Sequence, residues 1–320
     1  MSVEQDRDVI APREFDVLTL GEAMVLFAAQ EPGPLEEAFR FHRFCAGAEL
    51  NVAIGLTRLG HRVAYLSRLG NDSAGRFLLR CLAREGIATG LVETDSAYPS
   101  GFMLKSKAVD GQDPQIEYHR KGSAASTMSA ADLDRFDGLR ARHLHLTGIT
   151  PALSPSCREL VFATLAWARE RGMAISFDPN LRKPLWTSPD DMRETLGAIA
   201  ARSDIVLPGH VEGTALTGLE SPQDIARHFL SRGAKQVVVK LGAAGAWCAS
   251  SDGPALRVPG VQVDRVVDTV GAGDGFAVGV ISGLLEGLDL TAATARGNAI
   301  GARVVQFPGD SDGLPQRHEL

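Results

Sequence analysis

The stretch VVDTVGAGDGFAVGVISGLLEG, residues 266–287, connects a strand-like run to an apolar helical pattern through a glycine-rich turn. The turn Gly271-Ala272-Gly273 has almost no side chains, and it leads into a helix that we expect to begin near Asp274. Bare backbone N–H groups at a helix N-terminus form a binding site for an anion, typically a phosphate. The same helix dipole should keep the Asp274 carboxylate ionised near neutral pH, so that it can accept a proton from a hydroxyl group beside that phosphate.

Glycine recurs every four residues along the helix, at Gly275, Gly279 and Gly283. Each glycine costs about 1 kcal/mol of helix propensity relative to alanine, so we predict that another element packs closely on this face. The apolar span is too short for a membrane helix, which argues against a G-x-x-x-G membrane dimer. Taken alone, Asp274 is about as consistent with a helix N-cap as with a base. The run is neither a Walker A loop nor a dinucleotide-binding G-x-G-x-x-G.

Composition excludes several classes of protein. The 320 residues are 44% hydrophobic and 22% charged, as in soluble globular proteins. The net charge of −6, without a Lys/Arg cluster, argues against nucleic-acid binding. Four scattered cysteines predict reduced thiols in a cytoplasmic protein. Residues 1–14 mix acids with arginine and have no apolar core, so they predict a loose leader and no membrane anchor.

Short β-rich runs alternate with amphipathic helical patterns along nearly the whole chain, as in RVAYLSRLG (62–70) followed by AGRFLLRCLAREG (74–86). This order predicts an α/β fold with a mostly parallel sheet covered by helices on both faces. The segments 21–44 and 99–120 break the alternation and predict a small β lid on a single core domain, 15–320. Most predicted core strands end in Gly, Asp, Asn or Pro, and the carboxyl ends of such strands form the ligand crevice of open α/β sheets.

The motif DTVGAGDGF (268–276) resembles the C-terminal signature of the ribokinase, or PfkB, family of carbohydrate kinases. GAELNVAIGLTRLG (47–60) and LGNDSAG (69–75) resemble two further stretches of that family. The resemblance implies a ribokinase-like three-layer α/β/α core with a β lid, and transfer of the ATP γ-phosphoryl group to a sugar hydroxyl. It also implies that Asp274 is the catalytic base and that the amides of Gly271, Ala272 and Gly273 stabilise the transferring group.

The resemblance assigns further residues to the nucleotide and to metal ions. In VVKLGAAGAW (238–247), it places Lys240, Gly242 and Gly245 near ATP, whereas the pattern alone is equally that of a strand and its loop. It places Asn298 beside the adenine, Asp178 and Asn180 near the phosphate path, and Asp268 near a monovalent cation such as K⁺. VLPGHVEG (206–213) retains Glu212 of a motif that helps to organise Mg²⁺ and its waters, but Gly209 replaces the expected Asn.

Two stretches, EYHRKGSAAS (117–126) and FDPNLRKPLW (177–186), each carry an arginine beside hydrogen-bonding groups. Arginine suits bidentate capture of a carboxylate, so a sugar acid is the expected substrate. Both stretches resemble those of the 2-keto-3-deoxygluconate kinase branch, as does Glu22 in LGEAMV (20–25). The resemblance places Tyr118, Arg120 and Arg182 at the keto-acid end and Gly47, Ala48 and Asn51 at the sugar hydroxyls. Phe102 and Met103 stand where relatives often carry a tyrosine.

We therefore predict ATP-dependent phosphorylation of 2-keto-3-deoxygluconate to its 6-phosphate, with Mg²⁺ as a cofactor. The expected partners are the sugar acid and ATP, together with a homo-oligomer formed through the lid. The alternatives are another branch of the family, such as fructokinase or 5-keto-2-deoxygluconate kinase, and a non-catalytic sugar or nucleotide sensor. A dehydrogenase is disfavoured because LGEAMVLF (20–27) lacks a G-x-G-x-x-G after the first strand.

Overall fold

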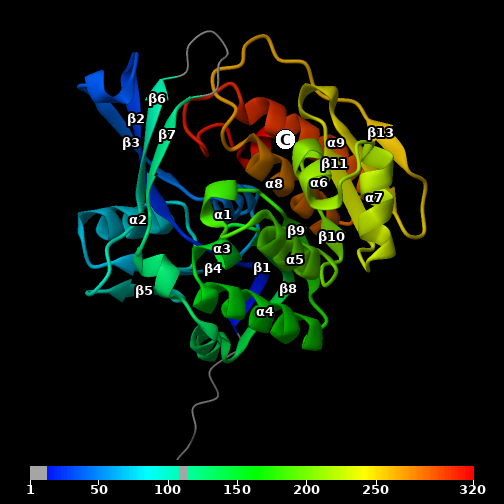
Figure 1. Ribbon diagram of the computed structural model, residues 1–320, viewed down its shortest axis with the longest axis horizontal. Helices are drawn as coiled ribbons and strands as arrows, with labels where there is room; N and C mark the ends of the chain where they lie inside the picture. Colours follow the sequence, from blue (N-terminus) through cyan, green and yellow to red (C-terminus); the bar gives the residue numbers. More distant parts are fainter. Residues whose placement is uncertain (1–12, 108–113) are drawn as a thin grey trace, which may run out of the picture.

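The computed structural model describes residues 13–107 and 114–320, which form two sheets and their flanking helices (Figure 1). The larger sheet has the strand order β13-β12-β11-β10-β9-β8-β1-β4-β5. All its pairs are parallel except β11–β12 and β12–β13, which confirms the predicted mostly parallel sheet. The strands are β1 (Arg13–Leu20), β4 (Val63–Gly70), β5 (Val92–Asp95), β8 (Leu139–Thr147), β9 (Ala174–Asp178), β10 (Ile205–Val206), β11 (Gln236–Lys240), β12 (Ala246–Ser250) and β13 (Leu256–Val258).

The central strands of this sheet supply two separate hydrophobic cores, because successive side chains point to opposite faces. In β4, Val63 and Tyr65 belong to one core, whereas Ala64 and Leu66 belong to the other. The first core is covered by α1 (Ala48–Arg58), α2 (Ser73–Arg84), α8 (Ala272–Leu285) and α9 (Leu290–Val304). The second is covered by α3 (Thr150–Leu153), α4 (Pro155–Glu170), α5 (Pro189–Ala200), α6 (His210–Thr217) and α7 (Pro222–Ser231). The predicted three layers follow from this alternation.

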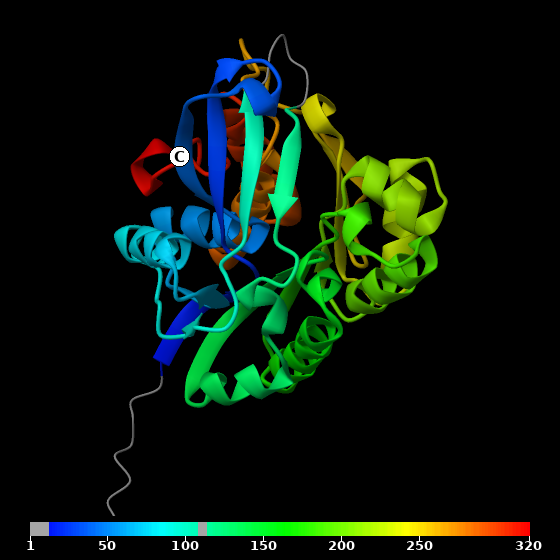
Figure 2. The same cartoon turned by 60° about the vertical axis from the view of Figure 1, so that its left-hand side comes forward.

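The smaller sheet has the order β3-β2-β6-β7 and stands upright above the core in Figure 2. Its strands are β2 (Met24–Pro32), β3 (Phe41–Ala46), β6 (Phe102–Lys107) and β7 (Ile116–His119). The pairs β2–β3 and β6–β7 are antiparallel, and β2–β6 is parallel. These strands come from the two segments that interrupt the alternation of the core, except that β3 continues to Ala46. We refer to this sheet as the lid.

The glycines of α8 lie against α9, as their spacing predicts. A Cβ atom built on Gly279 would lie 2.5 Å from the backbone of Gly297, and one on Gly283 would lie 2.9 Å from Ala293. Short 3₁₀ turns complete the described structure, at Leu35–Glu37, Ala124–Thr127, Ala130–Phe136, Lys183–Leu185, Gly242–Ala244 and Arg317–Glu319.

The first strand begins slightly earlier than the predicted boundary of the N-terminal leader. The predicted leader, residues 1–14, lies outside the described residues except for its last two positions, which already belong to β1. Among the helices of the described residues, none is long and apolar enough to span a bilayer.

Candidate active site

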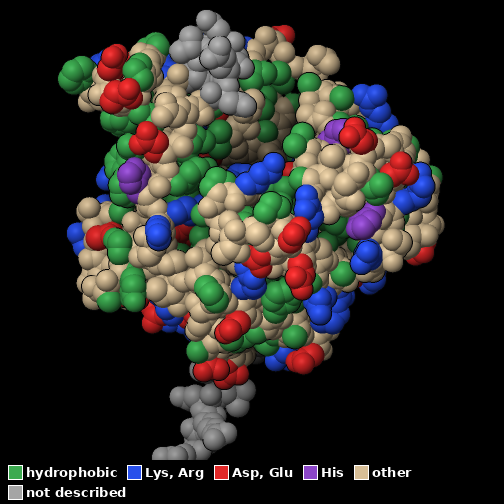
Figure 3. All heavy atoms as spheres, viewed as in Figure 1, with side chains coloured by type: hydrophobic (Ala, Val, Ile, Leu, Met, Phe, Trp, Pro, Cys, Tyr) green, Lys and Arg blue, Asp and Glu red, His purple; other side chains and the backbone are tan. Residues whose placement is uncertain are grey.

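A cavity of about 440 Å³ lies between the lid and the carboxyl ends of the core strands. Figure 3 shows a hollow on this side of the molecule, with Lys and Arg side chains along its lower rim. Segments far apart in the chain meet in the cavity, including the lid, the N-terminus of α1 and the turn before α8. Its lining contains Gly47, Ala48, Asn51, Tyr118, Arg120, Asp178, Asn180, Arg182, Glu212, Lys240, Gly271, Gly273 and Asp274.

Asp274 lies in the first turn of α8 and is almost fully buried. The Asn51 Nδ2 group donates to its Oδ2 at 2.7 Å, and the Asn180 Nδ2 group donates to its Oδ1 at 3.3 Å. Burial raises the pKa of Asp274 to about 8, against the opposing effect of the Asn51 hydrogen bond. This raised pKa contradicts the expectation that the group is ionised near neutral pH, because burial removes the hydration that stabilises the charged form.

Asn51 and Asn180 are themselves unusual. The Asn51 Oδ1 atom is buried and, among the described residues, has no hydrogen-bond partner. Asn180 is the one described non-glycine residue with a positive φ, 38°. Strained backbone and unsatisfied polar atoms concentrate at functional sites, where a ligand supplies the missing interaction. Asn51 therefore offers a free acceptor directly beside Asp274.

The turn before α8 needs its glycines for two different reasons. Gly271 has φ 84°, and a Cβ atom there would lie 2.2 Å from the Asp310 carbonyl oxygen, so the fold itself requires glycine. A Cβ atom on Gly273 would meet only the Lys240 Nζ atom, at 3.5 Å, which is an ordinary contact. The fold therefore does not require glycine at 273, and its absent side chain leaves the helix N-terminus open to an anion.

A cluster of buried and half-buried charges lies beside this turn. The Lys240 Nζ group donates to Asp178 Oδ2 at 2.6 Å. Burial raises the pKa of Asp178 to about 6, and Lys240 opposes that rise. The two carboxylate oxygens of Glu212 accept the N–H groups of Leu181 at 2.8 Å and Gly209 at 2.7 Å.

A second cavity, of about 330 Å³, lies on the other side of the turn. It shares Lys240, Thr269 and Gly273 with the first cavity, and its lining is largely apolar. Gly242, Gly245 and Asn298, which are predicted near ATP, line it, as does Ala272 of the turn. Asn298 is buried, and its Nδ2 group donates to the carbonyl oxygens of Val258 at 3.3 Å and Pro259 at 2.9 Å. Asp178 and Asn180 line only the first cavity.

The two predicted arginines differ in their surroundings. The Arg120 Nε group donates to Glu22 Oε2 at 2.6 Å, so its charge is already paired inside the protein. The Arg182 guanidinium donates to the Leu181 carbonyl oxygen at 3.1 Å and, within residues 13–107 and 114–320, to no carboxylate. Arg182 is therefore the cation of the first cavity that is free to bind an acid.

Asp268, the residue expected near a monovalent cation, lies beside the turn and pairs with a lysine of the lid. The Lys105 Nζ group donates to Asp268 Oδ2 at 2.6 Å. The other oxygen, Oδ1, accepts the N–H group of Val270 at 3.0 Å.

Sequence reasoning missed several residues of the first cavity. Asp310 lies in the C-terminal segment, where no motif indicates a site, and the apolar lining comes from Met24, Ile116 and Ile149. Met103, noted as a departure from the family pattern, also lines the cavity, whereas Phe102 stacks on His119 at a ring-centroid distance of 4.5 Å. Only the fold brings these positions together.

Comparison with known proteins shows to which family the chain belongs. The sequence profile of the pfkB family of carbohydrate kinases matches residues 14–317. This chain belongs to that family. The kinase is 47% identical over 308 residues to a 2-dehydro-3-deoxygluconokinase of Bacillus subtilis, covering 96% of this chain and 94% of the relative. It is 32% identical to a 2-dehydro-3-deoxygluconokinase of Thermoproteus tenax, covering 95% and 92% of the two chains.

Solved structures confirm the ribokinase-like fold of the kinase. A PfkB protein from Polaromonas is 51% identical, with a TM-score of 0.87 and coverage of 95% of this chain and 98% of that one. A putative ribokinase II of E. coli, solved with ATP and Mg²⁺, is 27% identical, with a TM-score of 0.87 and coverage of 95% and 97%. A fructokinase of Vibrio cholerae, solved as a double mutant with fructose, ADP and a potassium ion, is 27% identical, with a TM-score of 0.83 and 97% coverage of both chains.

Proposed function

We propose that this kinase phosphorylates 2-keto-3-deoxygluconate, also called 2-dehydro-3-deoxygluconate, at its terminal hydroxyl group with ATP as donor. The observation that carries the proposal is the Arg182 guanidinium, which lines the cavity of Asp274 without a carboxylate partner of its own. A carboxylate substrate would supply that partner and would be bound by a charge-assisted, bidentate contact. The two relatives named above as 2-dehydro-3-deoxygluconokinases support the same acid.

The residues around Asp274 suggest how the hydroxyl group would be activated. Asn51 Oδ1 would accept a hydrogen bond from a sugar hydroxyl, since it is buried beside Asp274 without a partner among the described residues. Asp274, once ionised, would take the proton of the terminal hydroxyl as its oxygen attacks the γ-phosphorus. The bond from phosphorus to the bridging oxygen of ADP breaks in the same step, giving ADP and the 6-phosphate.

ATP would occupy both cavities. Its base and ribose fit the apolar second cavity, and its phosphates would lie at the residues that both cavities share, Lys240, Thr269 and Gly273. Lys240, whose ammonium is held by Asp178, would neutralise phosphate charge, and the amides of the 271–273 turn would bind the transferring group. The amide of Ala272 already makes a long contact of 3.4 Å with the Thr269 carbonyl oxygen, so Gly271 and Gly273 are the stronger candidates.

Mg²⁺ bound to the phosphates would neutralise charge on the β- and γ-oxygens. Glu212 fits such an ion through a water molecule, because it lines the first cavity and each of its carboxylate oxygens accepts one N–H group and keeps a second lone pair. Gly209 has no side chain to offer a ligand, but its N–H group fixes the Glu212 carboxylate.

We also infer a homo-oligomer formed through the lid. β3 and β7 are the two edges of the lid sheet, and unpaired edges favour pairing with another chain. Phe39, in the connection between β2 and β3, has 93% of its surface exposed, which is unusual for an aromatic residue of a monomer.

ADP release over a panel of 2-keto-3-deoxygluconate, 5-keto-2-deoxygluconate, fructose and ribose tests the substrate. We expect Arg182→Ala to lower kcat/KM for the acid about 100-fold, the usual cost of a charge-assisted contact, and to change any turnover of fructose little. Lys183→Ala is the matched control, because Lys183 is the neighbouring exposed cation outside the cavity. Equal losses for acid and neutral sugars would overturn the sugar-acid assignment, and no ADP release with any sugar would favour a sensor. Arg120→Ala is less informative about the substrate, because it leaves the buried Glu22 carboxylate without its cation.

A further inference from the structure

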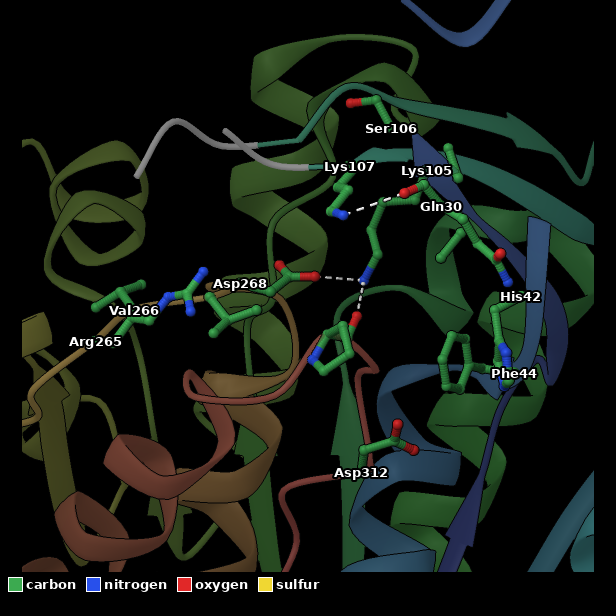
Figure 4. Close-up of a pocket in the computed structure, with 14 residues that line it drawn as sticks. Gln30, His42, Phe44, Lys105, Ser106, Lys107, Arg265, Val266, Asp268 and Asp312 are labelled. Atoms are coloured by element: carbon green, nitrogen blue, oxygen red, sulfur yellow. Dashed lines mark hydrogen bonds and ion pairs between the residues drawn. The ribbon is translucent and has the colours of Figure 1, made fainter. Parts of the chain in front are cut away.

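Lys105 is a buried cation beside the turn before α8, and it comes from the lid. Side chains alternate along β6, so Met103 and Lys105 share the face that points toward the core. Met103 lines the first cavity. Lys105, two residues later, has only 2% of its surface exposed. Figure 4 shows this side chain descending from the lid to the carboxylate of Asp268.

Three oxygen atoms surround the Lys105 ammonium group. Its Nζ atom lies 2.6 Å from Asp268 Oδ2, 2.9 Å from Asp310 Oδ1 and 3.1 Å from the Pro308 carbonyl oxygen. An ammonium group has three N–H donors, so every donor has an acceptor. Asp268 and Asp310 raise the pKa of Lys105 although burial acts to lower it.

The same group of oxygens does not fit a free monovalent cation. The family resemblance places such an ion near Asp268, and the fructokinase structure named above contains potassium. In this chain the Asp268 and Asp310 oxygens already hold a cation of the protein itself, which would lie within a few ångströms of any ion bound to them. Two like charges in a buried site repel strongly, because little solvent screens them.

Both acidic partners of Lys105 position the turn that would bind the γ-phosphoryl group. Asp268 uses its second oxygen to hold the Val270 N–H group at 3.0 Å. The backbone of Asp310 packs on Gly271, where any Cβ atom would collide with its carbonyl oxygen. The ammonium group thus links Asp268, which precedes Gly271 in the chain, to Asp310, whose backbone packs on Gly271.

We propose that Lys105 is a positioning residue that takes the place of the monovalent cation, so that this kinase works without potassium and its lid carries the charge that orders the 268–271 turn. The inference rests on the proposed kinase activity. A free ion would bind independently of the lid, whereas the tethered ammonium group couples the position of β6 to the anion-binding turn.

The first test compares ADP release by the full-length protein in potassium chloride and in choline chloride at equal ionic strength, with the sugar that the panel identifies. We expect the kcat of the unaltered kinase to agree within about twofold between the two salts. A kcat that falls several-fold in choline would overturn the proposal.

The second test uses Lys105→Ala, with Lys105→Met as an alternative should the first variant fold poorly. We expect kcat in choline to fall about tenfold or more, and potassium or ammonium ions to restore part of it. Lys107→Met is the matched control on the same strand. The Lys107 ammonium group donates to the Gln30 carbonyl oxygen and, among the described residues, to no carboxylate, so this variant should not respond to either ion. A merely structural ion pair would not be rescued by a small cation.

A readout without turnover separates this inference from the proposed function. Potassium should raise the melting temperature of Lys105→Ala above its value in choline and leave that of the unaltered protein unchanged. This comparison remains informative even if no sugar in the panel is phosphorylated. A folded variant that ignores potassium and ammonium in both kcat and melting temperature would overturn the proposal.

Discussion

Asp274 illustrates how burial and function oppose each other at a single residue. The environment that places this carboxylate beside the anion-binding turn also removes its water, and burial raises its pKa to about 8. A protonated carboxyl group cannot accept a proton, so in the proposed mechanism only the enzyme with ionised Asp274 is active.

We predict that kcat/KM rises about tenfold per pH unit below pH 8 and levels off above it, since ionisation of Asp274 limits the free enzyme. The measurement is ADP release from about pH 6 to pH 9.5 with limiting sugar acid. Asp274→Asn, which keeps the shape and cannot accept a proton, should lose turnover at every pH while still binding ATP and sugar by calorimetry. A flat profile, or appreciable turnover by this variant, would show that another group is the base.

At the scale of elements, the pairing of α8 with α9 depends on glycine. Gly275, Gly279 and Gly283 each face α9, and Gly279 lies directly against the backbone of Gly297. Because this pair positions the N-terminus of α8, its close approach also determines where Asp274 lies.

Gly279→Ala should destabilise the protein by about 2 kcal/mol, because the new methyl group would overlap a backbone that cannot move aside. Gly197→Ala is the control: Gly197 lies within α5, and a Cβ atom there meets nothing within 4 Å. This second change should stabilise by up to about 1 kcal/mol through helix propensity. Urea unfolding of both variants measures the difference, and equal effects would contradict the packing role of Gly279.

At the scale of the whole molecule, the lid presents two different surfaces. Its inner face contributes Met103, Tyr118 and Lys105 to the first cavity and to the turn beneath it. Its edge strands and Phe39 remain exposed in a single chain.

We expect the protein to sediment with twice the mass of one chain. Phe39→Glu should shift it toward the monomer, because a charge at this exposed site disfavours an apolar contact between two lids. Val211→Glu is the control, since Val211 is also strongly exposed but lies on α6, away from the lid. Analytical ultracentrifugation at several concentrations makes the comparison. A monomeric unaltered protein, or equal shifts for both variants, would rule out the lid edge as the interface.

The sequence alone determined the α/β class, the order of the elements and the base candidate, because hydrophobic periodicity and the DTVGAGD run are local signals. It also predicted the close packing of α8, since repeated helical glycines are costly unless something approaches them. The tertiary structure decided the rest. Burial raised the pKa of Asp274. Glu22 pairs with Arg120, whereas Arg182 has no carboxylate partner among the described residues. Lys105 pairs with Asp268, which is 163 residues away in the chain. Charge and hydration depend on neighbours in space, and no spacing along the chain specifies which carboxylate a lysine on another sheet will meet.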